Sequence, residues 1–328
     1  MRRRRGIFAW VVAFTQLAAV AVAQSPPSPT PTPATPSKGT RELPTGGLLL
    51  VPDYALVLDA YDLTIGRDEI RAVYTLSNPT PEPRAITVAF PLPDIDALSI
   101  GEQTVNFPKT EPLNFVGASL SADGVAMTPR FQQRAIILGL DVTTELEALR
   151  VPLFPYRSDM ADQLRRLPDV LIKEFQERGL ARYERDNLVP GWTLKTTAYW
   201  RHTIAPGKPS VLSLSYMPVM GSGTPEGNGS DGLGKSYCLD AVAEAAVAKH
   251  VGAVGASSPP LHWLTYNLTS GAGASLQAAQ FRLRIGRSAA DAAMATCRKD
   301  SKPVGPTVLE WTAKDFYPDD DIAVLFIR

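Results

Sequence analysis

The sequence predicts a mainly β protein: an antiparallel β-sandwich of one or two units, with a small helical insertion and one further helix. Short segments alternate apolar and polar residues with a period of two, which is typical of half-buried strands. Asn, Pro, Asp and Gly residues end these segments at close intervals, as turns do. A hydrophobic content of 45% is that of a folded chain with a sizeable core.

The N-terminus predicts export. Four arginines, Arg2–Arg5, precede an apolar run from Ile7 to Val22, and the run closes on a small-x-small site at its end. This order is typical of a Sec-type signal peptide. We therefore expect residues 1–23 to be removed by cleavage between Ala23 and Gln24.

An uncleaved N-terminal anchor is the alternative. The apolar run is shorter than the ~20 residues that a membrane-spanning helix needs, and Thr15-Gln16 interrupts it. We therefore expect a periplasmic or secreted protein with no membrane span in the mature chain. Because nucleotide cofactors are not normally supplied there, no cofactor is expected.

The first part of the mature chain differs in composition from the rest. Residues 24–45 are rich in Pro, Thr and Ser, which predicts a disordered spacer, either a stalk or a plain leader. Removing residues 1–23 takes away four arginines and no acidic residue, leaving 29 basic against 33 acidic residues. This slight acidic excess gives no reason to expect binding to nucleic acid.

Residues 46–140 are predicted to form the first part of the sandwich. Apolar residues alternate from Ile70 to Leu76 and again from Ile86 to Phe90, and prolines end both runs. A hairpin is expected at Asp123-Gly124, because this pair adopts the positive φ angles of a tight turn.

Residues 141–187 change to a helical period and are predicted to be a helical insertion. Three short helices are expected, over residues 141–150, 158–163 and 168–178. Leu171 and Phe175 lie at helical spacing and form an apolar face.

Residues 188–328 are predicted to be a second β-rich part. A glycine-rich loop is expected over residues 221–236 and a helix near residues 239–250. The expected strands are Leu194–Ile204, Ser210–Met217, Trp263–Leu268, Ala278–Ile285, Val308–Thr312 and Ile322–Ile327.

The chain has two cysteines, Cys238 and Cys297. In an exported protein, an even pair most simply forms one disulfide. Two buried free thiols are the alternative. Two thiols with scattered histidines lack the spacing of a metal site.

Four sequence stretches form a recognisable set: Asp62-Leu63-Thr64-Ile65, Val88-Ala89-Phe90-Pro91-Leu92-Pro93-Asp94, Tyr199-Trp200 through Ala205-Pro206-Gly207-Lys208, and Tyr237-Cys238-Leu239-Asp240. In these stretches the chain resembles an exported bacterial family catalogued as domain-of-unknown-function family 4424. They occur in the expected order over most of the mature chain. The resemblance implies an extracytoplasmic, β-rich protein, and it carries no established activity and no catalytic residue.

The remaining patterns give no catalytic, cofactor-binding or metal residue. Gly227, Gly229 and Gly232 form a G-x-G-x-x-G, but their low-complexity surroundings favour a surface loop over a nucleotide site. No G-x-S-x-G of a hydrolase occurs. Asp319–Asp321 is interpreted as a solvated turn rather than a calcium site. The histidines His202, His250 and His262 lie far apart in the sequence.

We therefore expect an exported, non-enzymatic binding or structural protein of the bacterial cell envelope, with an envelope protein or a glycan as its partner. Aromatic residues are candidates for a binding platform, although core packing is the favoured interpretation for most of them. These candidates are Trp192, Tyr199, Trp200 and Trp263.

Two other functions are alternatives: an extracytoplasmic hydrolase, and an accessory or sensor partner of a membrane complex. A pocket that unites His202 or His262 with carboxylates would favour the hydrolase.

Overall fold

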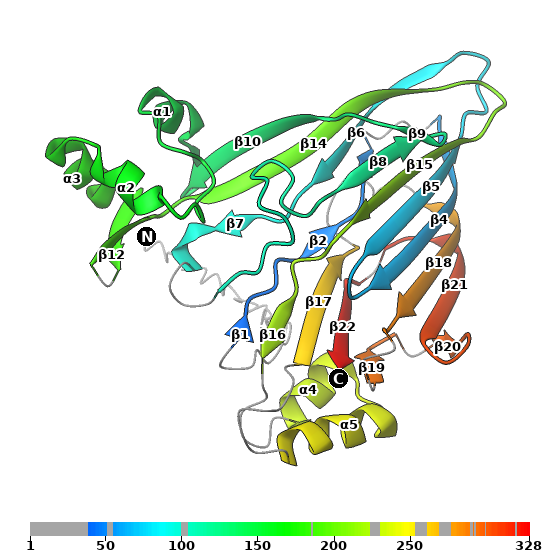
Figure 1. The fold of residues 1–328 in the computed structure, drawn as a ribbon. Helices are drawn as coiled ribbons and strands as arrows, with labels where there is room; N and C mark the ends of the chain where they lie inside the picture. Colours follow the sequence, from blue (N-terminus) through cyan, green and yellow to red (C-terminus); the bar gives the residue numbers. More distant parts are fainter. Residues whose placement is uncertain are drawn as a thin grey trace, which may run out of the picture. The chain divides into compact units, whose positions relative to one another are not determined.

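A computed structural model describes most of the chain after residue 38 (Figure 1). The described ranges are 39–50, 55–99, 104–184, 186–223, 230–252, 261–268, 277–288, 291, 293–298, 300–318 and 320–328. They confirm the predicted mainly β, antiparallel sandwich. The predicted signal peptide, with its expected cleavage site at Ala23 and Gln24, lies outside the described residues.

One layer of the sandwich is an eight-stranded sheet. Neighbouring strands in this sheet are antiparallel, except for β18 and β4, which are parallel to each other. In order across the sheet, the strands are β20 (Lys302–Pro303), β21 (Val308–Phe316), β18 (Ala278–Gly286), β4 (Val57–Gly66), β5 (Ile70–Ser77), β15 (Ser210–Tyr216), β8 (Ser119–Ala122) and β9 (Val125–Ala126).

Two six-stranded sheets form the other layer. The first contains β1 (Gly39–Thr40), β16 (Gly221–Gly223), β17 (Leu261–Asn267), β22 (Ile322–Ile327) and β19 (Ala293–Thr296), with β2 (Thr45–Gly46) on β17. The second contains β11 (Leu140–Asp141), β10 (Arg130–Ile137), β14 (Thr193–Ile204), β6 (Arg84–Pro91) and β3 (Leu49–Leu50), with β7 (Ile95–Asp96) on β14. A 3-10 helix, η1 (Ala97–Ser99), follows β7.

The main hydrophobic core joins the inner faces of all three sheets. On β5, Ile70, Ala72, Tyr74 and Leu76 are buried, while the residues between them are at least partly exposed. Phe90 of β6 and Tyr266 of β17 reach the same core from the other layer. The period-two alternation in the sequence therefore marks the inner face of the sandwich, as expected.

The helical insertion has its own core. The helices α1 (Thr143–Ala148), α2 (Met160–Arg165) and α3 (Asp169–Glu177) are confirmed. A hairpin of β12 (Ala181–Glu184) and β13 (Asn187–Pro190), which the sequence does not predict, follows them. Phe175 and Trp192 lie at the centre of this second core.

A third core lies under two helices at the lower edge of the first six-stranded sheet in Figure 1. α5 (Ala241–Gly252) matches the expected helix, but α4 (Ser230–Tyr237) occupies residues that were expected to be a loop. Leu233 and Tyr237 lie one helical turn apart, and both pack into this core. Tertiary packing thus overrides the weak helix propensity of a glycine-containing segment.

Ordered structure begins earlier than expected. Residues 39–45 were predicted to be the end of the spacer, but they contain β1 and the first residue of β2. Leu43 is buried, and its backbone N–H donates to Val219 O at 3.0 Å. Within the described residues, no helix is both long and apolar enough to cross a membrane.

Candidate functional site

The predicted binding aromatics do not form a platform. Trp192, Trp200 and Trp263 are buried in three different cores, and Tyr199 is half-buried on β14. The Trp192 indole N–H donates to Leu153 O at 2.8 Å. For the three tryptophans, core packing is therefore the correct interpretation and a shared binding surface is not.

The predicted disulfide is present. Cys238 and Cys297 are bonded at an S–S distance of 2.11 Å. Cys238 follows α4 and Cys297 follows β19, so the bond ties the two helices to the sheet edge. The bond occupies both thiols of the chain.

His202 contacts Ser210, a serine that the sequence analysis did not single out, and Ser210 in turn contacts Asp123 of the expected hairpin turn. His202 Nε2 lies 2.7 Å from Ser210 Oγ, and Ser210 Oγ donates to Asp123 Oδ1 at 3.0 Å. The Val211 N–H also donates to Asp123, and these two hydrogen bonds hold the pKa of Asp123 below its usual value.

This group differs from a catalytic triad. The single hydroxyl hydrogen of Ser210 goes to Asp123, so His202 must donate its own N–H to Ser210. A catalytic histidine would instead accept the serine proton. The contacts therefore fasten the Asp123-Gly124 turn to the start of β15.

His262 also lies in a structural environment. Burial lowers its pKa to about 4, so the ring is neutral at pH 7. The adjacent Asp291 is fully buried and accepts from Arg67 Nη1 at 2.9 Å and from Ser288 Oγ at 2.9 Å. This ion pair fixes the β4–β5 turn to the connection between β18 and β19.

The structure describes only some of the remaining candidates, which are the glycine motif, His250 and the Asp319–Asp321 cluster. Gly227, Gly229 and Asp319 lie outside the described residues, as does the side chain of His250. Asp321 accepts from the Leu268 N–H at 2.9 Å, which orders the turn before β22. Among the described residues, no group of three His, Cys, Asp or Glu side chains is placed to hold a metal ion.

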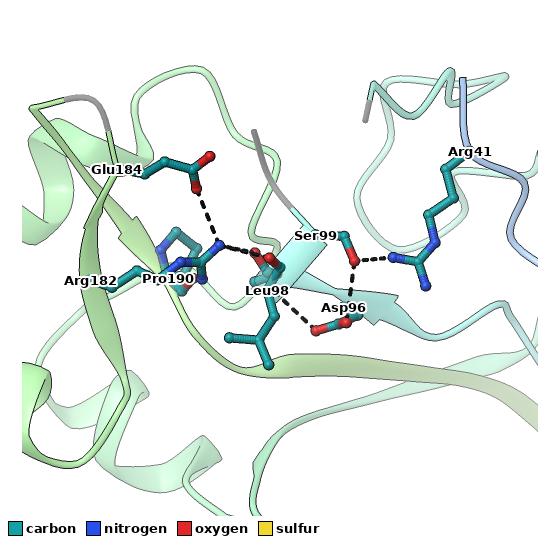
Figure 2. A network of polar contacts seen from close by, with 8 residues as sticks. Arg41, Asp96, Leu98, Ser99, Arg182, Glu184 and Pro190 are labelled. Atoms are coloured by element: carbon teal, nitrogen blue, oxygen red, sulfur yellow. Dashed lines mark hydrogen bonds and ion pairs between the residues drawn. The ribbon is translucent and has the colours of Figure 1, made fainter. Parts of the chain in front are cut away.

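A second polar cluster joins the N-terminal segment to the insertion (Figure 2). Arg41 contacts Ser99, and Ser99 Oγ donates to Asp96 Oδ2 at 3.3 Å. Arg182 donates to Leu98 O at 2.7 Å and to Glu184 Oε2 at 3.2 Å. Arg182 donates to several acceptors of the chain itself and Arg41 to Ser99, so these contacts fasten the N-terminal segment and the insertion to the segment around Ser99.

A small cavity between the layers is lined by three tyrosines, Tyr61, Tyr74 and Tyr266. Tyr61 Oη and Tyr266 Oη lie 2.6 Å apart, and the Leu48 N–H donates to Tyr74 Oη at 3.0 Å. Burial raises the pKa of all three hydroxyls, which keeps them protonated. The free space is about 30 Å³, which holds one or two water molecules but no organic ligand.

The outer face of the eight-stranded sheet carries a concentration of positive charge. Five cations project from β5, β18, β20 and β21, and three anions lie among them, two on β4 and one on β21. We call this set the cationic face. Its charged residues are Arg71, Arg282, Arg284, Lys302, Lys314, Asp59, Asp62 and Glu310.

Strand register arranges the cationic face in cross-strand rows. Arg284 lies opposite Thr64 on one side and Glu310 on the other, and Glu310 lies opposite Lys302. In the next rows, Asp62 lies beside Arg282, and Gln280 beside Lys314. Side chains directly opposite one another on adjacent strands are close enough to interact.

Two hollows lie on the cationic face and adjoin at Thr312. The first has a volume of about 370 Å³ and is lined by Asp62, Gln280, Arg282 and Lys314, among others. The second has a volume of about 600 Å³, and its lining includes Asp300, Ser301, Lys302, Val304, Glu310 and Trp311. Both volumes lie in the range of ligand sites, roughly 300–1,000 Å³.

The fold and this surface define a disulfide-stapled, antiparallel β-sandwich protein with one charged sheet face. The chain belongs to the family described as "Domain of unknown function (DUF4424)", whose model matches residues 38–325. The resemblance noted from the four sequence stretches is thereby confirmed.

Two solved structures that are similar to this chain have low sequence identity to it. A search of curated proteins finds no match. A Legionella pneumophila structure described as a "putative nutrient binding protein" is 13% identical, with a TM-score of 0.44, over 88% of this chain and 72% of that chain. An M1 zinc metallopeptidase from Deinococcus radiodurans is 11% identical, with a TM-score of 0.29, and this chain covers 42% of its length. At these values, neither match bears on the activity of this chain.

Proposed function

We propose that the protein is an exported, non-enzymatic binding protein of the bacterial cell envelope, and that its cationic face binds an anionic partner. The observation that carries this proposal is that three cations on one sheet face, Arg71, Lys302 and Lys314, form no ion pair within the described residues, while Arg282 and Arg284 pair with Asp62 and Glu310. Basic and acidic residues balance in the whole chain, so these unpaired cations are a local feature of this face. A local charge excess steers and holds an oppositely charged partner.

The other candidate sites support binding rather than catalysis. The contacts of His202 fasten a turn, and the carboxylate beside His262 is committed to Arg67 and Ser288. None of the cavities described above is lined by either histidine.

The sequence organisation supports a place in the envelope. Under this proposal residues 1–23 direct export, the Pro-rich residues that follow hold the domain away from a surface, and the sandwich presents its cationic face. An envelope glycan and an acidic envelope protein are the partners that this arrangement suits.

Chromatography on an immobilised polyanion, heparin–agarose at pH 7, tests the proposal. The mature protein should be retained at low salt even though acidic residues slightly outnumber basic ones. Lys302→Glu/Lys314→Glu should elute at clearly lower salt than the wild type. Lys173→Glu/Lys249→Glu is the matched control, because it makes the same change in net charge at exposed helix positions. Equal losses in the two variants would contradict a localised site.

A further inference from the structure

We infer that the anionic partner is an acidic polysaccharide, a sugar polymer with sparse carboxylate groups, which lies along β18 and β21. This inference rests on the proposed function and names its ligand class. Four features of the cationic face carry it: open guanidinium ends, two unpaired lysines, neutral and acidic groups between them, and an apolar wall.

The two arginines on β18, Arg282 and Arg284, have terminal guanidinium nitrogens that are available to a ligand. Arg282 contacts Asp62, and Arg284 contacts Glu310 at 2.8 Å, in both cases through Nε. The terminal nitrogens of both side chains donate to no acceptor in the described part of the chain. A guanidinium end of this kind can bind a carboxylate with two parallel hydrogen bonds.

Two lysines lie at opposite ends of the face. Lys302 and Lys314 are exposed, and neither forms an ion pair within the described residues. Lys302 lies opposite Glu310, four residues from Lys314 along β21, so about 13 Å of strand separates them. An extended ligand with widely spaced negative charges matches this separation.

The side chains between the cations can form hydrogen bonds with the hydroxyl groups of a sugar. Gln280 and Thr312 are exposed neutral hydrogen-bonding residues, and the carboxylates of Asp62 and Glu310 accept hydrogen bonds. A sugar hydroxyl both donates and accepts, so it can bind to every one of these groups.

The second hollow adds an apolar wall. Val304 is 51% exposed and lines this hollow. Trp311 reaches the hollow from the other face of β21, where its ring contacts Phe281 and Phe316 and the Arg298 guanidinium lies over it, 4.1 Å from its centroid. The exposed Val304 side chain is therefore the part of this wall that can pack against the C–H groups of a sugar ring.

The same carboxylates disfavour a phosphate polymer. Each unit of polyphosphate carries a negative charge, so some units would lie against Asp62 or Glu310 and be repelled. A polymer whose charges alternate with hydroxyls avoids this contact.

Titration calorimetry with three probes tests the inference: a hyaluronan oligosaccharide, in which only every second sugar carries a carboxylate, its neutral methyl ester, and inorganic polyphosphate of similar length. We expect the hyaluronan oligosaccharide to bind and each other probe to bind at least tenfold more weakly. Lys302→Gln/Lys314→Gln should weaken binding of the hyaluronan oligosaccharide at least tenfold. Lys173→Gln/Lys249→Gln should leave that binding unchanged. Circular dichroism of each variant checks that it is folded.

The outcomes separate the two proposals. Equal or tighter binding of polyphosphate would overturn the ligand class but leave an anionic partner in place. Equal binding of the methyl ester would overturn the role of the carboxylates. If no probe binds and heparin–agarose does not retain the protein, both proposals fail.

Discussion

Gly47 has no room for a side chain, because tyrosine hydroxyls converge on its α-carbon. A β-carbon at this position would lie 2.0 Å from Tyr74 Oη and 2.5 Å from Tyr266 Oη. Gly47→Ala must therefore shift these tyrosine side chains or the backbone that carries the new methyl group. We expect a loss of about 1–3 kcal/mol in the free energy of unfolding, measured by urea denaturation.

Gly234 provides the control for this substitution. It lies in α4, and a β-carbon there meets no atom within 4 Å. Gly234→Ala should therefore leave stability unchanged or raise it by up to about 1 kcal/mol. If Gly47→Ala were as well tolerated as Gly234→Ala, the packing described around the tyrosines would be wrong.

Glu42 makes stability depend on pH. Thr265 Oγ1 donates to Glu42 Oε1 at 3.2 Å, but Oε2 is buried without a hydrogen-bond partner. Burial raises the pKa of this carboxyl from 4.5 to about 7. The folded state therefore holds a proton that the unfolded chain releases, so stability should fall as pH rises from about 4.5 to 7.

Glu42→Gln tests this prediction, because its amide stays neutral. The variant should be more stable than the wild type at pH 8, by at most about 3 kcal/mol, and the difference should shrink towards pH 5. His262 has a lowered pKa of about 4, so it acts in the opposite direction below pH 6.5 in both proteins. A stability difference between Glu42→Gln and the wild type that stays constant from pH 5 to pH 8 would refute the titration.

At the scale of elements, the disulfide holds the third core together. Cys238 and Cys297 are 59 residues apart in sequence, and their bond links the helices to β19. We expect Cys238→Ser/Cys297→Ser to lower the free energy of unfolding by ~2–4 kcal/mol, mainly because the unfolded chain gains freedom. Urea denaturation with and without reductant measures it. Reductant should destabilise the wild type by a similar amount and leave the double variant unaffected; a reductant-insensitive wild type would count against a stabilising bond.

Strands with clean alternation could be predicted from the sequence, and those with interrupted alternation could not. β5 and β6 alternate throughout and were predicted almost to the residue. β4 was missed as an element, because a bulge between Leu58 and Ala60 breaks its alternation. β10 was missed because polar residues such as Gln132, Gln133 and Arg134 interrupt its pattern.

The same limit applies to the aromatic candidates. Residues 199 and 200 are adjacent on β14, so their side chains point to opposite faces, and only Trp200 enters the main core. The sequence shows that residues 199 and 200 are both large aromatics, but it does not show which of the two is buried. Which of them is buried depends on the sheet that covers each face.

At the scale of the whole molecule, the cationic face could not be predicted, because it depends on strand register. Asp62 and Arg282 are 220 residues apart and meet only because β4 and β18 pair in parallel. The sequence shows balanced charge and no basic cluster on this part of the chain. The fold gathers its positive charge from four strands.

Export is the property of the whole chain on which the envelope role depends. In a bacterial host that secretes the full-length protein, the mature form should begin at Gln24, having lost residues 1–23. Intact mass should also be lower by two hydrogens, because the Cys238–Cys297 bond forms and persists only in an oxidising compartment. A Cys238→Ser/Cys297→Ser variant separates the two mass changes, because the cell should still cleave its leader but the variant cannot lose two hydrogens. Recovery of the leader-bearing, reduced chain with cytosolic enzymes would remove the basis for an envelope partner, even if the cationic face binds polyanions in vitro.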